Sequence, residues 1–554
     1  MTEPGLTPVT ESDGGEIEGA LGRIGAGEES RSGWRRRLVT FLAIVGPGLI
    51  VMVGDNDAGG VATYAQAGQN YGYSLLWVLL LLIPVLIVNQ EMVVRLGAVT
   101  GVGHAKLIYE RFGRFWGSFS VIALFLLNFL TIVTEFIGIA LAMSYFGVSP
   151  YASVPVATAM LIAITTSGSF RRWERAMFVF IAASVVLFVP LVVFSHPHAA
   201  SVAFHLVVPG VRGGVSSDAV LLIIAIVGTT VAPWQLYFQQ SNVVDKRITP
   251  RFIRYERADT VLGSLVVVVS AAVIMIATVY AVAGTPRAGH FTDALGVAYA
   301  FDAKSSFLGA VFALVLLFAS VIGAAAVTLA TSYAVGDVFN LKHSLHRTFR
   351  DAKAFYASYS VMVVLAAGIV LLPGAPLGLL TTAVQALAGI LLPSATVFLL
   401  LLCNDPEVLG PWANHRWLNV VAGIIIGLLL TLSGTLVVTT LFPGLSAPVV
   451  AVGIAVVLAA GSALAFAWLQ VTAARRGQAA GAGAEGGTAR VAAARARFAR
   501  LTPAERARWR MPPLALLKPV AWSPVTKLTI GVMWVYLVVS VLLLVVKAVQ
   551  LAAG

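Results

Sequence analysis

The sequence predicts an all-α membrane protein built on an inverted repeat of five plus five helices, with its first and sixth helices broken and two or three further spans behind. Three observations support this prediction. The 554 residues are 58% hydrophobic and only 11% charged, whereas a soluble domain carries about 25% charged residues. Apolar runs of about 20 residues, long enough to cross a bilayer, recur along the chain. Two of these runs, five spans apart, are interrupted at membrane depth.

Thirteen apolar runs qualify as candidate spans, and the alternative count of twelve stays open. The predicted core, residues 38–403, comprises a first repeat at 38–194 and a second repeat at 218–403. Additional helices at 417–471 and a final helix at 528–549 follow. The runs cover residues 38–69 (interrupted), 74–94, 117–143, 151–167, 175–194, 218–244 (interrupted), 258–284, 306–338, 355–372, 376–403, 417–442, 447–471 and 528–549.

Lysine and arginine residues cluster in every second connection, at 35–37, 95–114, 171–175, 246–257 and 342–353. Because cytoplasmic loops are enriched in these residues, the amino terminus is expected to be cytoplasmic. Residues 1–37 are expected to form a disordered cytoplasmic tail. Residues 474–527, rich in Ala, Gly and Arg, are expected to form a cytoplasmic linker that contacts anionic lipid. The net charge of +12 therefore requires no nucleic-acid partner, and the expected partner is the lipid bilayer.

The break in the first span carries two carboxylates, in the segment GDNDAGGVATYAQAG at residues 54–68. The second break falls in the sixth span, at GTTVAPWQLYFQQS (228–241), where Pro233 cannot donate a backbone hydrogen bond. Irregular backbone at this depth is tolerated only where it lines a cavity enclosed by protein or filled with water. Two such helices, five spans apart, are typical of transporters that bind their substrate at the membrane midplane. A loop between short helices, or a simple proline kink, is the alternative.

Oxygen atoms at the two breaks are suited to bind a metal cation. Unwound carbonyl groups and the carboxylate of Asp57 supply hard oxygen ligands, and an acidic residue inside a span is by default a functional residue. The candidate metal-binding residues at the breaks are Asp57, Gly54, Asn56 and Thr229. Candidates for the ion pathway are Asp55, Gln90, Gln235 and Gln385.

Several motifs resemble the Nramp family of divalent-metal transporters, in order as well as in composition. The segment GPGLIVMVGDNDAGGVATYAQAGQNYGYSLLW, followed by VVRLGAVTG, resembles the first two helices of that family. TEFIG (134–138), TSYAVGDV (331–338) and NHRWLNV (414–420) resemble its third-helix acidic motif, the end of its eighth helix and the start of its eleventh helix. The resemblance covers roughly residues 38–440. It implies a LeuT-type fold and the import of divalent metal cations by alternating access. It also implies candidate metal-binding positions at Gly60 and Ala232 and candidate pathway or coupling positions at Glu135, Trp234 and Gln239.

Two departures from the family pattern bear on ion selectivity. The first-helix sequence Asp-Pro-Gly-Asn of the family reads Asp-Ala-Gly-Gly at residues 57–60, and its sixth-helix Met-Pro-His reads Ala-Pro-Trp at residues 232–234. A thioether ligand favours Mn²⁺, Fe²⁺ or Cd²⁺ over Mg²⁺. Without it, a wider site of oxygen ligands can admit an ion that keeps several waters, as Mg²⁺ does. This pattern resembles the Nramp-related magnesium transporter branch, which implies Mg²⁺ and Mn²⁺ as transported ions and no cofactor.

Proton coupling is expected to be absent. Typical family members carry an Asp three residues before the third-helix Glu, and His residues on the sixth helix. Here Glu135 is kept, but the other positions are Ile132, Trp234 and Gln239. Histidine titrates near neutral pH, so its loss removes a natural proton carrier, although Asp55 could substitute for it. The membrane potential can still drive uptake, because a divalent ion that crosses about 100 mV gains about 4.6 kcal/mol.

Three functional hypotheses follow. The first is an Mg²⁺/Mn²⁺ importer of the Nramp type, a multi-pass protein expected in the bacterial cell membrane. The second is a proton-coupled Mn²⁺/Fe²⁺ importer of the same family. The third is a sodium-coupled amino-acid carrier, since such carriers share the broken-helix architecture, although Asp57 at the break counts against a site for an anionic carboxylate. No nucleophile motif, nucleotide-binding loop or zinc signature is present, so an enzyme is not expected.

Overall fold

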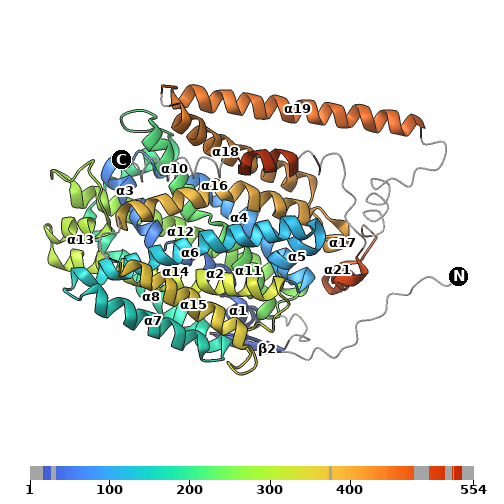
Figure 1. The fold of residues 1–554 in the computed structure, drawn as a ribbon, viewed down its shortest axis with the longest axis horizontal. Helices are drawn as coiled ribbons and strands as arrows, with labels where there is room; N and C mark the ends of the chain where they lie inside the picture. The colour runs from blue at the N-terminus through green and yellow to red at the C-terminus, as the bar shows by residue number, and fades with distance from the viewer. Residues whose placement is uncertain are drawn as a thin grey trace.

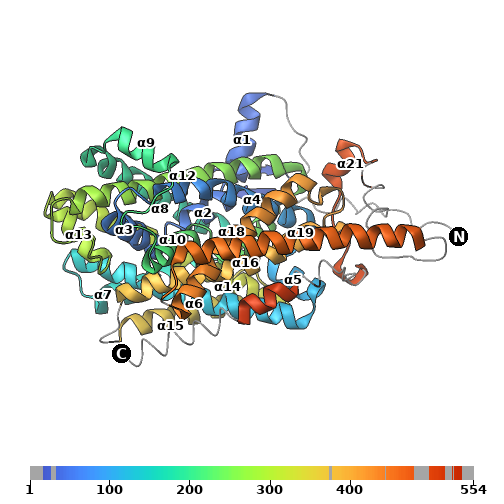
Figure 2. The same ribbon diagram turned by 90° about the horizontal axis from the view of Figure 1, so that it is seen from above.

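The structure is a computed structural model that describes residues 16–25, 33–372, 377–442, 444–479 and 500–517, together with 498, 527 and 530–538. Long helices packed side by side form the body of the molecule (Figure 1). Seen from above, α1 (Trp34–Ile44) projects from one side of this body (Figure 2). The predicted all-α fold class is confirmed.

The first broken helix is divided into α1, α2 (Pro47–Gly54) and α3 (Ala58–Tyr71). The helices that follow it in the first half of the chain are α4 (Leu76–Thr100), α5 (His104–Phe112), α6 (Arg114–Tyr145), α7 (Pro150–Thr166), α8 (Phe170–Ser195) and α9 (Ala199–Val207).

The second broken helix is divided into α10 (Ser217–Thr230) and α11 (Pro233–Asp245). It is followed by η1 (Pro250–Phe252), α12 (Ile253–Val282), α13 (Ala294–Asp302), α14 (Ser306–Val338), α15 (Lys353–Val370), α16 (Leu377–Cys403), α17 (Pro406–Leu409), η2 (Gly410–Trp412), α18 (Arg416–Leu441), α19 (Ala447–Ala479), α21 (Pro503–Arg508) and η3 (Leu514–Leu516).

Within the described residues, ten helices are long and apolar enough to cross a membrane, or eleven if α1 and α2, bent by 50°, form one span. The sequence predicts twelve or thirteen. Part of the difference is α7, an apolar helix of only 17 residues. The predicted final span, 528–549, lies largely outside the described residues. Helices α18 and α19 correspond to two of the extra spans that the sequence predicts after the core.

The broken helices lie at the centre of the bundle. The apolar stretch within Ser217–Asp245 is 94% buried, whereas that of Ala447–Leu464 in α19 is 11% buried. Helices α12 and α14 pack against both α2 and α3, α6 packs against α3, and α16 packs against α10. The outer surface of α19 instead presents exposed valines such as Val449, Val452 and Val456. A helix that is apolar around its whole circumference suits a lipid environment, because only hydrocarbon satisfies such a surface.

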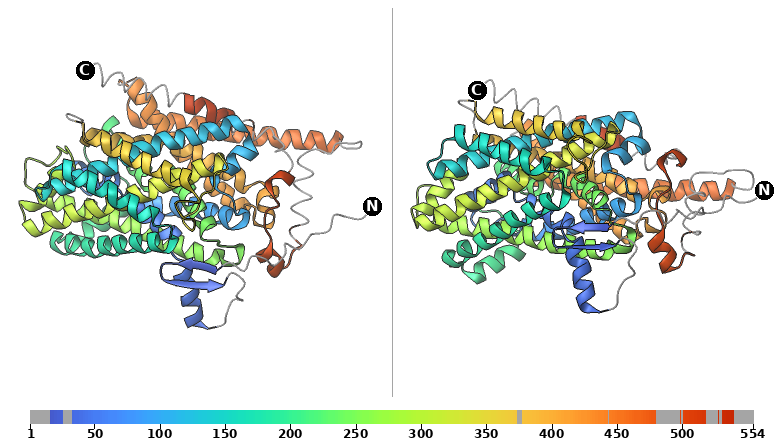
Figure 3. Two further views of the ribbon diagram at one scale, coloured as in Figure 1. Left: turned by 60° about the horizontal axis from the view of Figure 1, so that its bottom comes forward. Right: turned by 90° about the horizontal axis from the view of Figure 1, so that it is seen from below.

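The expected disordered tail at residues 1–37 is wrong for residues 16–25 and 34–37. Residues Glu16–Gly19 (β1) and Gly22–Gly25 (β2) form an antiparallel hairpin beside α1, in which Ile17 and Ile24 are buried (Figure 3). The turn of the hairpin is held by an acidic residue of α8, because the N–H of Ala20 donates to Glu174 Oε2 at 2.5 Å. The sequence carries no local signal for this order, since the partner lies 154 residues away.

Glu174, which binds the hairpin, also takes part in a buried ion pair. Lys246 Nζ, just after α11, lies 2.7 Å from Glu174 Oε1, and both side chains are fully buried. The same ammonium donates to the carbonyl oxygens of Ile44 and Val45, at 2.9 Å each. One lysine therefore joins the end of α11, the start of α8 and the bend between α1 and α2.

The predicted linker at 474–527 also differs from the structure. Helix α19 continues to Ala479, and α21 is a short helix whose capping box joins Thr502 and Glu505. The backbone N–H of Met511 donates to the carbonyl oxygen of Val99 at the end of α4, at 3.1 Å. This part of the chain is thus attached to the helical bundle. Hydrogen bonds from the backbone of Thr502 lower the pKa of the exposed Glu505 carboxyl.

Candidate functional site

The two helix breaks are short. Helix α2 ends at Gly54 and α3 begins at Ala58, while α10 ends at Thr230 and α11 begins at Pro233. At the two predicted breaks, irregular backbone is confined to residues 55–57 and 231–232, while residues 45–46 form a separate bend between α1 and α2. From the sequence we expect non-helical backbone near residues 55–60 and 229–233. These bounds are too wide, because α3 already begins at Ala58, α10 continues to Thr230 and α11 begins at Pro233. Asp57 caps α3 by accepting the N–H of Gly60 at 2.6 Å, and Pro233 starts α11 at a position where its missing N–H costs nothing.

The two breaks lie side by side, as the sequence predicts. The hydroxyl of Thr229 is 3.5 Å from the carbonyl oxygen of Asp55. Beside this contact, the hydroxyls of Tyr64 and Thr230 are hydrogen-bonded at 2.8 Å. Half-helices from the two broken spans are therefore in direct contact at their polar ends.

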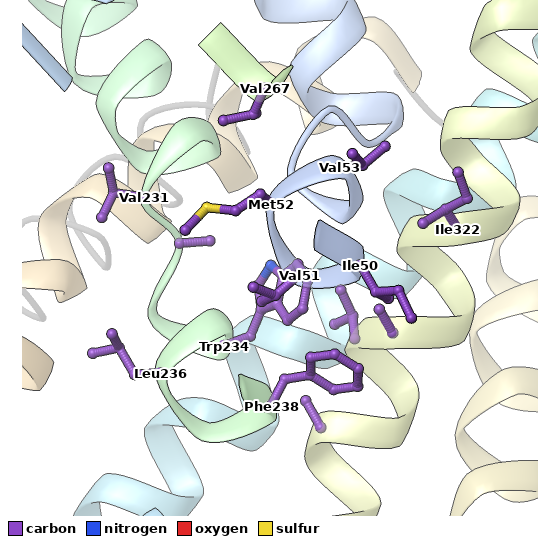
Figure 4. Close-up of a cluster of buried hydrophobic side chains, with 14 of the residues drawn as sticks. Ile50, Val51, Met52, Val53, Val231, Trp234, Leu236, Phe238, Val267 and Ile322 are labelled. Carbon is purple, nitrogen blue, oxygen red and sulfur yellow. The ribbon is translucent and has the colours of Figure 1, made fainter. Parts of the chain in front are cut away.

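Trp234 occupies the space on one side of the breaks. Its indole lies so close to Gly54 that a Cβ atom there would be 3.1 Å from the ring. Figure 4 shows this ring among Val51, Phe238 and other apolar side chains. Its Nε1 atom is buried without a hydrogen-bond partner. Ala232, the residue before the half-helix, is also buried.

Three carboxylates are buried around the first break: Asp55, Asp57 and Glu135. Glu135 on α6 accepts the N–H of Ala58 at 3.0 Å, next to the capped Asp57. Gly323 on α14 permits this arrangement, because a Cβ atom there would lie 2.7 Å from Glu135 Oε2 and 2.8 Å from Asp57 Cβ. The sequence offers no signal for Gly323, which lies inside an ordinary apolar run.

Several oxygen atoms near the first break are buried without a hydrogen-bond partner. They are both carboxylate oxygens of Asp55, Oδ1 of Asn56 and Oε1 of Glu135. The amide nitrogen of Asn56 is occupied, since it donates to the carbonyl oxygen of Val267 at 3.2 Å. Buried polar atoms are nearly always paired, so oxygens of this kind mark a place where a cation or water fits.

The glutamines predicted for the pathway fall into two groups. Gln90 Nε2 donates to Gln235 Oε1 at 2.9 Å, and Gln235 donates to the carbonyl oxygen of Thr230 at 3.3 Å. Gln239 lies one turn further along α11 and donates to Thr260 at 3.1 Å. Gln385 lies apart from these, on α16 against Gly59 of α3, with its Nε2 atom unpaired. The structure therefore joins Gln90 and Gln235 to the second break and Gln385 to the first.

The site is not a cluster of the usual metal-binding side chains. Within the described residues, no group of three or more His, Cys, Asp and Glu side chains is arranged to hold a metal ion. A cation at the breaks would be bound by carboxylate, amide and backbone oxygens together. Oxygen atoms of these kinds are hard ligands, which suit a divalent cation.

The site is closed to both membrane sides in this structure, since Asp55, Asn56 and Asp57 are each at most 3% exposed. A small cavity of about 10 Å³ adjoins it. Its lining includes Ala58 next to Asp57 and extends to Asp293, which caps α13.

Residues 48–439 match the family described as "Natural resistance-associated macrophage protein-like", abbreviated Nramp. The chain belongs to the Nramp family. This match covers most of the chain and includes both breaks, Glu135 and the pathway glutamines. Nramp members are transporters rather than enzymes, so the chain is a multi-pass integral membrane transporter, as the sequence predicts.

Individual Nramp relatives agree with this assignment. The divalent metal cation transporter MntH of Burkholderia ambifaria is 28% identical over 73% of this chain and 91% of its own length. MntH 1 of Pseudomonas aeruginosa is 30% identical over 71% of this chain and 90% of its own length. The manganese transporter of Eremococcus coleocola has a solved structure that superposes with a TM-score of 0.59 at 21% identity, covering 78% of this chain and 95% of that one. This structural likeness supports the LeuT-type inverted-repeat fold.

Proposed function

We propose that this Nramp protein imports divalent metal cations, Mg²⁺ and Mn²⁺, by alternating access around the two helix breaks and without proton coupling. The basic connections support a cytoplasmic amino terminus, and the organisms of the relatives support a bacterial cell membrane. The relatives named as divalent metal cation transporters support the class of substrate.

One observation carries the proposal: unpaired buried carboxylate and amide oxygens of Asp55 and Asn56 lie at the first break, which is in direct contact with the second break through Thr229. Asp57 is the expected anionic ligand, with Asn56 and the carbonyl oxygens of Gly54 and Thr229 as neutral ones. Asp55 adds a second carboxylate, both of whose oxygens are free of protein partners. Two acidic groups offset the charge of a divalent cation, which a buried site requires.

A flux assay in proteoliposomes tests the proposal directly. Mg²⁺, Mn²⁺ and Ca²⁺ uptake are compared with and without a pH gradient, and we expect Mg²⁺ and Mn²⁺ to enter in both conditions. Uptake of Mn²⁺ and Fe²⁺ alone, and only with an inward proton gradient, would favour the second hypothesis. The manganese transporter among the relatives favours that alternative, as does the buried carboxylate of Glu135, which contacts the start of α3 next to Asp57. Sodium-dependent amino-acid uptake would favour the third hypothesis.

Ala232→Met is expected to shift selectivity toward softer ions. A thioether placed beside the break would bind Cd²⁺ and Mn²⁺ better than Mg²⁺, so the ratio of Cd²⁺ to Mg²⁺ uptake should rise by about tenfold, equivalent to about 1.4 kcal/mol. Ala232→Leu is the matched control, because Leu has a similar volume and no sulfur. If both variants change the ratio equally, the effect is steric and residue 232 does not face the ion.

Mg²⁺ influx is expected to proceed without acidifying the vesicle lumen. Ile132, Trp234 and Gln239 are buried at positions where typical relatives hold titratable groups, and Oε2 of Glu135 accepts the N–H of Ala58. Influx should follow an imposed membrane voltage more strongly than external pH, since about 100 mV supplies about 4.6 kcal/mol to a divalent ion. A pH dye trapped in the lumen measures the result. Acidification in step with Mg²⁺ uptake would contradict uncoupled transport and make Asp55 or Glu135 the carrier.

A further inference from the structure

Below the second break, α11 and α12 bring polar side chains together on the side that we propose to be cytoplasmic. Gln239 of α11 donates to Thr260 of α12 at 3.1 Å. Helix α11 runs from this contact to Asp245, and α12 starts at Ile253 on the same side. Residues three or four positions apart share one face of a helix. Asn242 therefore lies on the same face of α11 as Gln239, and Glu256 lies on the same face of α12 as Thr260. Each is about one helical turn beyond the contact.

These side chains carry a set of unpaired oxygens. Gln239, Asn242 and Glu256 are each at most 1% exposed. Oε1 of Gln239, both amide atoms of Asn242 and both carboxylate oxygens of Glu256 lack a hydrogen-bond partner. Such a density of buried, unpaired polar atoms is unusual, because leaving each one unpaired costs about 1–3 kcal/mol.

The neighbouring charges do not neutralise Glu256. Lys246 is a neighbouring cation, but its ammonium is occupied by Glu174 and by two carbonyl oxygens. Asp259 is also occupied, since it accepts the N–H groups of Gly46, Gly48 and Leu49 at the start of α2. Within the described part of the chain, Glu256 forms no ion pair. An unpaired buried carboxylate is costly unless it binds a cation or a proton.

We propose that Glu256, Asn242 and Gln239 form a second divalent-cation site, through which the ion passes on its way out of the breaks. One carboxylate and two amide oxygens leave several positions for water, which is how Mg²⁺ is usually bound. Asn242 follows Pro233 by nine residues, or about 14 Å along the helix, so one ion cannot occupy both sites. The direction of passage rests on the proposed function, whereas the binding of the ion does not.

Counting bound Mn²⁺ tests the site without relying on transport. The full-length protein in detergent is titrated with Mn²⁺, and free Mn²⁺ is measured by its electron paramagnetic resonance signal. We expect two bound ions in the unmodified protein and one in Asp57→Ala, with the remaining ion lost in the double variant Asp57→Ala/Glu256→Gln. In this double variant, the Kd of the second site for Mn²⁺ should weaken by at least about tenfold.

Matched variants separate this result from a loss of folding or of charge. Glu110→Gln removes an exposed carboxylate of α5 and should leave the count at two. Asn242→Asp adds a carboxylate to the proposed site and should tighten binding of the second ion by about tenfold. If Glu256→Gln and Asn242→Asp both leave the count and the Kd unchanged, Glu256 holds only a proton and the proposal is overturned. If Asp57→Ala leaves two ions bound, the proposed function loses its ligand while the second site stands.

Discussion

Asp57→Ala is expected to lower divalent-cation flux by about 100-fold or more while the protein still inserts and folds. Asp57 is the charged residue that the sequence pattern and the geometry both place at the first break, where its carboxylate lies beside Glu135 and the N–H of Gly60. A factor of 100 corresponds to about 2.8 kcal/mol, a reasonable loss for one anionic ligand of a buried cation. Mg²⁺ and Mn²⁺ uptake into proteoliposomes measures the result.

The structure adds a control for this variant. Because Asp57 also caps α3, alanine removes a helix cap worth about 1 kcal/mol in addition to the ligand. Asp57→Asn keeps the cap, since asparagine is an equally good capping residue, but it removes the charge. Both variants should lose flux, and only Asp57→Ala should show a lower melting temperature. Normal flux in Asp57→Asn would mean that Asp57 acts through the cap and that Asp55 binds the ion.

Lys246→Met is expected to lower the free energy of unfolding by about 3–5 kcal/mol. The substitution leaves Glu174 fully buried and unpaired, and breaking a buried ion pair in this way costs several kcal/mol. It also frees the carbonyl oxygens of Ile44 and Val45. The loss should appear as a lower denaturation midpoint of the purified protein in detergent.

Two further variants identify the cause of that loss. The double variant Lys246→Met/Glu174→Gln removes both charges and should recover much of the stability, because the penalty comes from the unpaired charge. Lys106→Met is the matched control: Lys106 donates to Asn340 at the surface, and its loss should cost no more than about 0.5 kcal/mol. Equal destabilisation by Lys106→Met and Lys246→Met would contradict a special role for the buried pair.

The sequence by itself determined the order and approximate bounds of most of the described spans. The predicted run at 306–338 has the bounds of α14, and the run at 376–403 differs from α16 by one residue. These boundaries are predictable because burial in lipid or protein requires a continuous apolar stretch of fixed minimum length. The positions of the two breaks were equally clear, since Gly, Asp and Pro disrupt a helix through local effects that depend on the residue alone.

The tertiary structure decided which polar residues meet. The order of residues 16–25 depends on Glu174, and the place of Glu174 depends on Lys246, each far away in the sequence. Likewise, Asp57 and Asp55 look equivalent in the sequence, yet one is engaged as a helix cap and the other has both oxygens free. The spacing of apolar residues along the sequence indicates only which residues are buried. The pairing of a buried carboxylate depends on which distant backbone or side-chain group the packed helices bring within about 3 Å, the range over which a hydrogen bond forms.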